Sequence, residues 1–304
     1  MFDLTVIGDI NLDLCTCHSL KLAFSDLVKN SHPIWEPLEE VPGGTGLNFA
    51  KYARDIGLSP LLLGCVGDDL PGRFLRNWLT KMGFVDGLSQ SSKPTGRAFI
   101  TRDRNDIRLL IDNSPNANND LTYDAITKYL DIIRKSGILY ISGYAIRLPG
   151  SSRHEATLQL LQCLADNRSV NVIFDVVPHE MYKLYSFEHF YRITQNAKVL
   201  VSDVNTMRRF LGLGSLEQEI DDNKSYETAN LLKRYYQGVI LRWGPSGTDY
   251  ELLADFSRGT MKIHETEHKN LPVQGKRGYG DRLTIEALRG FFGLIAGSNT
   301  RESS

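Results

Sequence analysis

Apolar runs that alternate with helical patterns are the feature that most constrains how this 304-residue chain can fold. One run, residues 2–7, ends at Gly8, and another, residues 61–66, ends at Gly67. Between them, residues 48–58 carry apolar side chains at helical spacing. Short apolar runs that end at glycine are typical of strands buried on both faces of a parallel sheet.

The same alternation continues through the second half of the chain. Strand patterns cover residues 138–143, 170–175, 199–203 and 238–244, the last clear strand, and helical patterns cover residues 72–83, 158–164 and 206–211. Residues 98–111 instead alternate as the strands of a hairpin do. The sequence therefore predicts an α/β fold in which helices cover both faces of a parallel sheet, with ligands at the carboxyl ends of the strands.

Charge and hydropathy exclude several classes of protein. The 35 basic and 36 acidic side chains leave a net charge of −1, which predicts no nucleic-acid-binding surface spread over the whole protein. No apolar run reaches the roughly 18 residues needed to span a membrane. The N-terminus carries Asp3 and enters a strand pattern at once, unlike a signal peptide. We expect a cytoplasmic protein with no membrane partner.

A glycine turn near the C-terminus combines two useful chemical groups. Gly278-Tyr279-Gly280-Asp281 stands immediately before a helical pattern. Free N–H groups at a helix start can hold a developing phosphate charge, and a carboxylate can take a proton from an alcohol. A small-molecule phosphotransferase needs both. The alternative is an ordinary loop-to-helix junction, with Asp281 favoured there by the helix dipole.

Several motifs, in this order, resemble the ribokinase-like (PfkB) family of carbohydrate kinases, from residue 6 to about 290. Residues 8–13 (GDINLD) resemble the opening strand of the family, and residues 43–50 (GGTGLNFA) resemble its Gly-Gly-x-x-x-Asn-x-Ala signature. The resemblance implies one kinase domain over residues 1–304. Its expected fold is a three-layer α/β/α sandwich with a mostly parallel central sheet and a small β lid, built from about 14–42 and 97–113.

The resemblance also implies a sugar site at Asn11, Asp13, Gly43, Gly44 and Asn48. Carboxylate and amide groups can pair with adjacent hydroxyls, and glycines let the backbone approach a polar ligand closely. The alternative is structural. In that case Asn11 and Asp13 close a strand-end turn, and Asn48 caps the following helix.

The nucleotide site implied by the resemblance is less well matched. Arg242, Gly244 and Gly247 fit a Thr-x-Gly-x-x-Gly turn along the nucleotide phosphates, with Arg in place of Thr. An arginine can still grip a phosphate through its forked donors. Asp203 and Thr206 stand where the family carries Asn-x-x-Glu, and Thr206 cannot replace a carboxylate. ATP and Mg²⁺ are the implied cofactors, and no metal ligand is assigned.

The glycine turn falls on the catalytic motif of the family. Asp281 matches the catalytic base, and Gly278, Tyr279 and Gly280 match the anion hole. By the family mechanism, Asp281 accepts the proton of a substrate hydroxyl as that oxygen attacks the γ-phosphorus of ATP. We expect an Asp with an ordinary pKa to suffice, because the proton can move late in a loose transition state.

The chain departs from the family around this turn. Gly275 replaces an Asp that helps to hold a monovalent cation, which implies that this cation site is absent. We hypothesise that Lys276 or Arg277 supplies a fixed cation instead, although both can simply be exposed. Tyr279 replaces an Ala, and its ring could reshape the phosphate path. The chain stops soon after residue 298, so we expect a shortened C-terminus and an adenine site that lacks one wall.

The expected function is ATP-dependent phosphorylation of a hydroxyl of a sugar or sugar-like small molecule, including a nucleoside. The alternative is a catalytically weak or inactive family member that binds a sugar or nucleotide as a sensor or partner subunit. We expect substrate choice to depend on the lid and on Arg97, Phe99 and Tyr144. Lid sheets in this family often pair between subunits, so a homodimer through the lid is a further expectation.

A rival motif lies at residues 264–268, where HETEH fits His-Glu-x-x-His. Zinc-protease chemistry requires that motif on a helix, so that both imidazoles share one face. Residues 261–263 alternate like a strand, and Pro272 follows. This context predicts a strand and a loop, and it disfavours a metalloprotease.

Overall fold

The computed structural model describes residues 2–27, 29, 34–105, 107–165, 169–214, 220–243, 250–256, 259–265 and 278–292. No helix in these ranges is long and apolar enough to cross a membrane.

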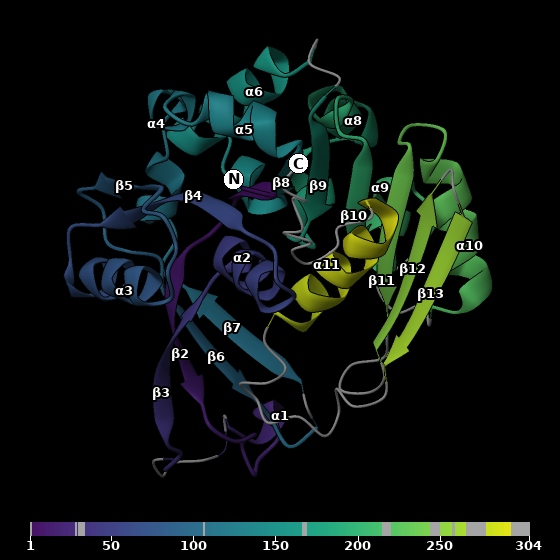
Figure 1. The fold of residues 1–304 in the computed structure, drawn as a ribbon. Coiled ribbons are helices and arrows are strands. Elements are labelled where there is room, and N and C mark those ends of the chain that lie inside the picture. Colours follow the sequence, from purple (N-terminus) through teal and green to yellow (C-terminus); the bar gives the residue numbers. More distant parts are fainter. Residues whose placement is uncertain are drawn as a thin grey trace, which may run out of the picture.

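The larger of two sheets forms the centre of the molecule (Figure 1). Within the described ranges it has nine strands in the order β13-β12-β11-β10-β9-β8-β1-β4-β5. They are β1 (Leu4–Ile7), β4 (Pro60–Gly67), β5 (Leu88–Ser91), β8 (Ile138–Ser142), β9 (Asn171–Val176), β10 (Val199–Asp203), β11 (Gly238–Trp243), β12 (Tyr250–Phe256) and β13 (Gly259–Glu265). Strands from β5 to β11 run parallel, with Val6 opposite both Leu62 and Tyr140, whereas β12 is antiparallel to β11 and β13.

Helices cover both faces of this sheet. One face carries α2 (Thr45–Asp55), α3 (Leu70–Lys81) and α11 (Tyr279–Phe292). The other carries α4 (Tyr123–Thr127), α5 (Leu130–Ser136), α6 (Ser152–Cys163), α7 (Met181–Leu184), α8 (Phe187–Thr194), α9 (Val204–Phe210) and α10 (Asp222–Leu232). There are also two short 3-10 helices, η1 (Ala117–Asp120) and η2 (Gly143–Ile146), the second directly after β8.

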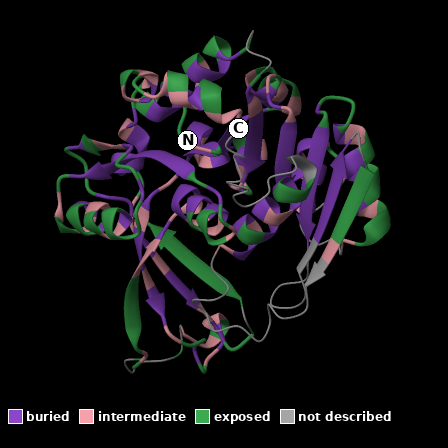
Figure 2. Cartoon of the chain, in the orientation of Figure 1, coloured by how far each residue is buried: buried purple, intermediate pink, exposed green. Residues whose placement is uncertain are grey.

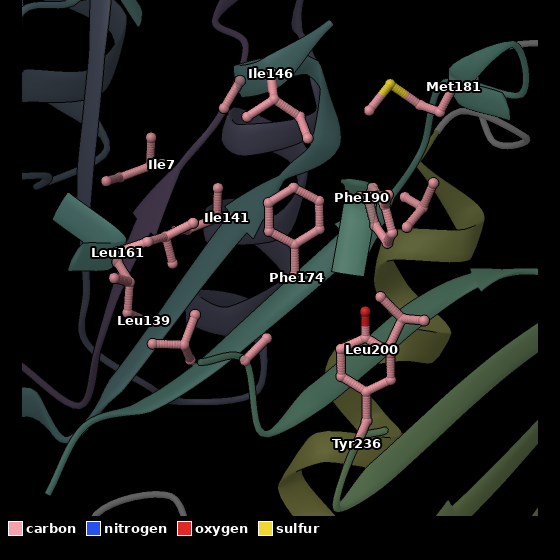
Figure 3. Packing of buried hydrophobic residues seen from close by; sticks show 14 of the residues in the cluster. Ile7, Leu139, Ile141, Ile146, Leu161, Phe174, Met181, Phe190, Leu200 and Tyr236 are labelled. Carbon is pink, nitrogen blue, oxygen red and sulfur yellow. The ribbon is translucent and has the colours of Figure 1, made fainter. Parts of the chain in front are cut away.

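The sheet divides the hydrophobic core into two halves, because alternate side chains of a strand point to opposite faces. In β8, Leu139 and Ile141 belong to one cluster, and Tyr140 belongs to the other. Phe174 of β9 packs edge-to-face against Phe190 of α8, with ring centroids 5.8 Å apart (Figure 3). Burial of each strand on both faces explains its nearly continuous apolar sequence.

A second, smaller sheet projects from one end of the larger one (Figure 1). In the described part of the chain its order is β3-β2-β6-β7, with β2 (Asn11–Thr16), β3 (Leu38–Gly43), β6 (Ala98–Arg102) and β7 (Arg108–Asp112). Only residues 8–10 separate β1 of the large sheet from β2 of the small one. The short helix α1 (Phe24–Leu27) lies beside this sheet, and β3 and β7 are largely exposed (Figure 2).

The predicted fold class is confirmed. The sheet is mostly parallel with helices on both faces, residues 98–111 form the expected antiparallel pair β6–β7, and a small separate sheet is present. The strand expected at residues 261–263 is confirmed by β13, whereas β12, which pairs with both β11 and β13, was not predicted.

Candidate active site

The crossing from β1 to β2 positions the predicted sugar-binding residues. The Asp9 carbonyl accepts hydrogen bonds from the N–H groups of Gly46 and Leu47 at the start of α2, at 3.1 and 3.2 Å. Gly44 has a φ of +90°, and a Cβ atom there would lie 2.4 Å from the Asp9 oxygen. A glycine is therefore required at this position, which locks the helix start onto the end of β1.

Two predicted sugar-binding side chains lie along β2. Asp13 is only 4% exposed, and a Cβ atom at Gly43 would lie 2.0 Å from its Oδ2, so the glycine leaves room for the carboxylate. Asn11 Oδ1 accepts a hydrogen bond of 2.8 Å from Asn118 Nδ2, and Asn118 Oδ1 accepts one of 2.9 Å from the Ile10 N–H. Sequence reasoning missed Asn118, which lies more than a hundred residues along the chain.

Asn48 joins the sugar side to the glycine turn. It lies on α2, and a Cβ atom at Gly278 would lie 3.0 Å from the Cβ, Cγ and Nδ2 atoms of Asn48. Gly278 has a φ of +62°, a conformation that also favours glycine. The structure thus brings together two predicted site residues that are far apart in the sequence.

The glycine turn leads directly into α11, as predicted. The Arg282 N–H donates to the Gly278 carbonyl at 3.0 Å, whereas N–H groups of the first turn have no acceptor within the helix. The Tyr279 side chain is 3% exposed and belongs to the core cluster on the α2 face, with the Arg282 guanidinium 5.6 Å from the ring centre. The tyrosine ring therefore packs in the interior.

Asp281 lies in the first turn of α11 and is 7% exposed. Burial raises the pKa of Asp281 to about 8, the Asp175 and Asp203 carboxylates add to the rise, and the Arg242 guanidinium opposes it. Sequence motifs alone indicated no more than an ordinary pKa. The difference arises because strands β9 and β10 bring two further carboxylates to the same place.

The predicted nucleotide-binding residues Asp203 and Arg242 are neighbours at the ends of β10 and β11. The Arg242 side chain is buried and forms an ion pair of 2.8 Å with Asp175, while its Nε lies 3.5 Å from Asp203 Oδ1. His179 Nδ1 lies 3.2 Å from Asp203 Oδ2 and 3.1 Å from Thr206 Oγ1. Sequence reasoning missed His179, which no motif singled out.

Several residues named from the sequence lie outside the described residues. They are Gly244 and Gly247 of the nucleotide turn, Gly275, Lys276 and Arg277 of the cation hypothesis, and His268 of the rival motif. His264 and Glu265 end strand β13, so this part of the motif is not helical. Cavities of about 430 and 260 Å³ occur among the described residues, and neither is lined by a predicted site residue.

The two faces of the small sheet differ in character. Strand pairing places Cys15 opposite Ile100, Ile100 opposite Leu110, and Asp13 opposite Val41. Side chains alternate along each strand, so Asp13, Ile100 and Leu110 share one face with Arg108 and Asp112. We call this the inner face, because Arg147 Nη1 of the main body lies 3.3 Å from Asp112 Oδ2.

Arg97 and Phe99 lie on the opposite, outer face. Phe99 pairs with Leu14 and Ile111, and the Arg97 guanidinium bonds to Glu40 of β3. Strand register therefore places both side chains on the face away from Asp13, and their expected part in substrate choice stays a prediction. A strand alternates its side chains, and the residues between them, such as Ala98 and Ile100, share the face of Asp13.

Arginine side chains surround Tyr144 where the inner face meets the main body. Arg153 is buried on α6, pairs with Asp9 and donates to the Tyr144 carbonyl at 2.7 Å. Burial and the Asp9 charge raise the pKa of Tyr144 to about 12, and the positive charges of Arg108 and Arg147 oppose that rise. Sequence reasoning missed all three arginines, which come from separate elements.

Among the described residues, Arg108 differs from the other two arginines because it forms no ion pair. Arg147 is bound to Asp112 and also to Glu180, whose Oε1 lies 3.0 Å from the Arg147 Nε. Arg108 is exposed on β7, on the face shared with Asp13. Of the three arginines near Tyr144, Arg108 alone carries a positive charge that no carboxylate of the described chain neutralises.

Comparisons with known proteins identify the family and the fold. Residues 1–200 match the family model described as pfkB family carbohydrate kinase. A 5-dehydro-2-deoxygluconokinase of Listeria innocua is 24% identical over 260 residues, which cover 81% of this chain and 72% of that protein. A protein of the same name from Halalkalibacterium halodurans is 26% identical over 193 residues, covering 62% of this chain and 52% of its own length.

Solved structures share the fold at lower identity. A ribokinase from Giardia lamblia has a TM-score of 0.66 and 18% identity, covering 86% of this chain and 76% of its own. A PfkB protein from Polaromonas sp. JS666 has a TM-score of 0.70 and 15% identity, covering 97% of this chain and 90% of its own. At such identities these likenesses are evidence for the fold alone.

The raised pKa of Asp281 predicts a stability effect that depends on pH. Between about pH 4 and pH 8 the folded protein holds a proton on Asp281 that the unfolded chain has lost, so this group lowers stability as the pH rises. Asn carries no charge. We therefore expect Asp281→Asn to raise Tm, least near pH 4 and by roughly 5 °C or more at pH 9, measured by calorimetry.

A matched control has the opposite sign. Burial acts against the charge of Asp103, but backbone N–H groups of Phe24, Ile107 and Asn105 lower its pKa. Asp103→Asn should therefore lower Tm at neutral pH, and the loss should shrink as the pH falls below about 4. A Tm difference for Asp281→Asn that stays constant from pH 4 to pH 9 contradicts the assignment.

Proposed function

Because the chain belongs to the pfkB family of carbohydrate kinases, we propose that it transfers the γ-phosphoryl group of ATP to a hydroxyl of a sugar, with Asp281 as the base. The contact between Gly278 and Asn48 is the observation that carries this proposal. It puts the turn that bears Asp281 directly beside a residue of the sugar signature.

The proposed step is an in-line displacement. The acceptor hydroxyl oxygen attacks the γ-phosphorus, its proton passes to Asp281, and the bond to the β-phosphate oxygen breaks to release ADP. N–H groups at Gly278, Tyr279 and Gly280 face the developing charge on the transferred group. A carboxylate whose pKa lies near the working pH suits this role, because it can accept the proton without being a permanent charge.

Mg²⁺ normally accompanies ATP in kinases, and the described residues offer it no dedicated cage. They contain no group of three or more His, Cys, Asp or Glu side chains placed to hold a metal. Mg²⁺ is commonly bound through one or two carboxylates together with the substrate phosphates. The residues therefore fit an ion that enters with the nucleotide.

The base role predicts a large loss on substitution. Asp281→Asn keeps the size of the side chain and removes its ability to accept a proton, so turnover should fall roughly a hundredfold or more. We would measure ADP formation with ATP over a panel of neutral sugars, sugar acids and nucleosides. A native protein no faster than the variant on every substrate favours the alternative, a non-catalytic binding protein.

We propose a sugar acid, of the kind that 5-dehydro-2-deoxygluconate represents, as the acceptor. Two observations support it. The curated relatives carry that substrate in their name, and Arg108 presents a guanidinium without a carboxylate partner in the described chain, on the face of Asp13 and near Tyr144. A guanidinium matches the geometry of a carboxylate.

The sugar-acid proposal is tested by Arg108→Gln. Loss of a charged hydrogen bond of about 1.5–3 kcal/mol should raise KM for the sugar acid roughly tenfold or more and leave KM for ATP unchanged. Arg97→Gln, which alters an arginine on the outer face of the same sheet, is the control and should change neither constant. Equal KM values for the sugar acid in the native protein and in Arg108→Gln would contradict the proposal.

We further propose that the outer face of the small sheet is a homodimer surface. Leu38, Leu109 and Ile111 are exposed there, and β7 is an edge strand of the sheet as described, with backbone groups left unpaired along that edge. Both features favour association. Ile111→Glu should convert a dimer to a monomer in sedimentation analysis. Leu184→Glu, at a similarly exposed position on α7, is the control and should leave the dimer intact. A native protein that sediments as a monomer contradicts the proposal.

A further inference from the structure

A buried ion pair lies close to the proposed catalytic base, Asp281. Asp175, at the end of β9, is 0% exposed, and its carboxylate accepts hydrogen bonds from Arg242 Nη2 at 2.8 Å and Nη1 at 3.2 Å. The Tyr140 hydroxyl of β8 donates to the same carboxylate at 2.9 Å. Such a bidentate pair fixes both side chains in one geometry.

The same guanidinium reaches the first turn of α11. Arg242 Nη1 donates to Thr284 Oγ1 at 3.3 Å, and Thr284 Oγ1 donates to the Gly280 carbonyl at 2.7 Å. Thr284 is fully buried. A continuous chain of hydrogen bonds therefore runs from Asp175 through Arg242 and Thr284 to the peptide that joins Gly280 to Asp281.

We propose that Arg242 and Asp175 are positioning residues. They hold the first turn of α11 in place, and their opposite charges balance one another's effect on the Asp281 carboxylate. The inference rests on the proposed function, in which Asp281 is the base. It also gives Arg242 a different role from that expected from the sequence, in which it binds a nucleotide phosphate.

Among the described residues, each charge that faces Asp281 comes from a different element. They are Asp175 of β9, Asp203 of β10 and Arg242 of β11, and the Tyr140 hydroxyl of β8 is also near. Removing the positive charge leaves Asp281 facing two carboxylates, which disfavours its own ionisation. Removing the Asp175 charge leaves it facing the arginine and a single carboxylate, which favours ionisation. Two substitutions that break one ion pair therefore act on Asp281 in opposite directions.

The decisive experiment is the pH dependence of kcat/KM for Asp175→Asn and Arg242→Gln. The acid limb, which reports the base of the free enzyme, should move to lower pH in Asp175→Asn and to higher pH in Arg242→Gln, by about one pH unit or more in each case. Arg242→Lys keeps the charge and should return the limb towards its native position. Shifts in the same direction, or no shift, overturn the proposal.

A matched control separates positioning from general stability. Arg208 is another buried arginine, paired with Glu227 at 2.6 Å between α9 and α10. Arg208→Gln should lower Tm and leave the acid limb where it is. If the acid limb moves as far in Arg208→Gln as in Arg242→Gln, any buried arginine has this effect, and the proposal is overturned.

A second readout does not require turnover. The change in Tm caused by Asp281→Asn, followed against pH, reports the ionisation of Asp281 directly. When Asp281→Asn is introduced into the Asp175→Asn and Arg242→Lys proteins, the midpoint of this change should fall in the first and stay near the native value in the second. If the native protein proves to have no kinase activity, this measurement still decides the electrostatic inference; an unchanged midpoint in Asp175→Asn overturns it. The same measurement decides the inference if Arg242→Gln does not fold, because it uses Arg242→Lys instead.

Discussion

The architecture of the site depends on a backbone contact between Gly8 and Gly46. A Cβ atom on either residue would lie 2.7 Å from backbone atoms of the other, so neither position tolerates a side chain without moving the main chain. This close approach lets the Asp9 carbonyl take up two N–H groups at the start of α2. The position of α2 determines that of Asn48, and Asn48 in turn contacts the turn before α11.

Desolvation then sets the chemistry of the site. Parallel strands end at a common edge, so β9, β10 and β11 bring Asp175, Asp203 and Arg242 together, and α11 adds Asp281. Burial disfavours charge on Asp175 and Asp281, while the arginine favours it. The pKa of Asp281 rises to about 8 as a result, which suits its proposed role as a proton acceptor.

The fold could be predicted because it depends on local patterns, and motifs also gave candidate site residues, whose roles stay predictions. Apolar runs ending at glycine indicated the parallel strands, and the helical pattern after Gly280 indicated α11. Strand β12 was missed because its sequence, YELLADF, lacks the continuous apolar run of a buried parallel strand. His179, Arg153 and Asn118 were missed since their roles come from long-range contacts. The face on which Arg97 and Phe99 lie was not foreseen, because it depends on strand register, which a motif does not contain.

The anchoring of Asn11 gives the small sheet the mechanics of a lever. Asn11 is held at its base by Asn118, and the Leu12 N–H bonds to the Gly96 carbonyl at 2.9 Å, so the first strand starts from a fixed pivot. At roughly 3.3 Å per residue, Asp13 lies about 7 Å from that pivot and the far end of β2 about 17 Å. Any rotation of the sheet about that pivot therefore sweeps its tip more than twice as far as the Asp13 carboxylate. The proposed sugar contact at Asp13 would thus move less than half as far as the tip when the sheet swings.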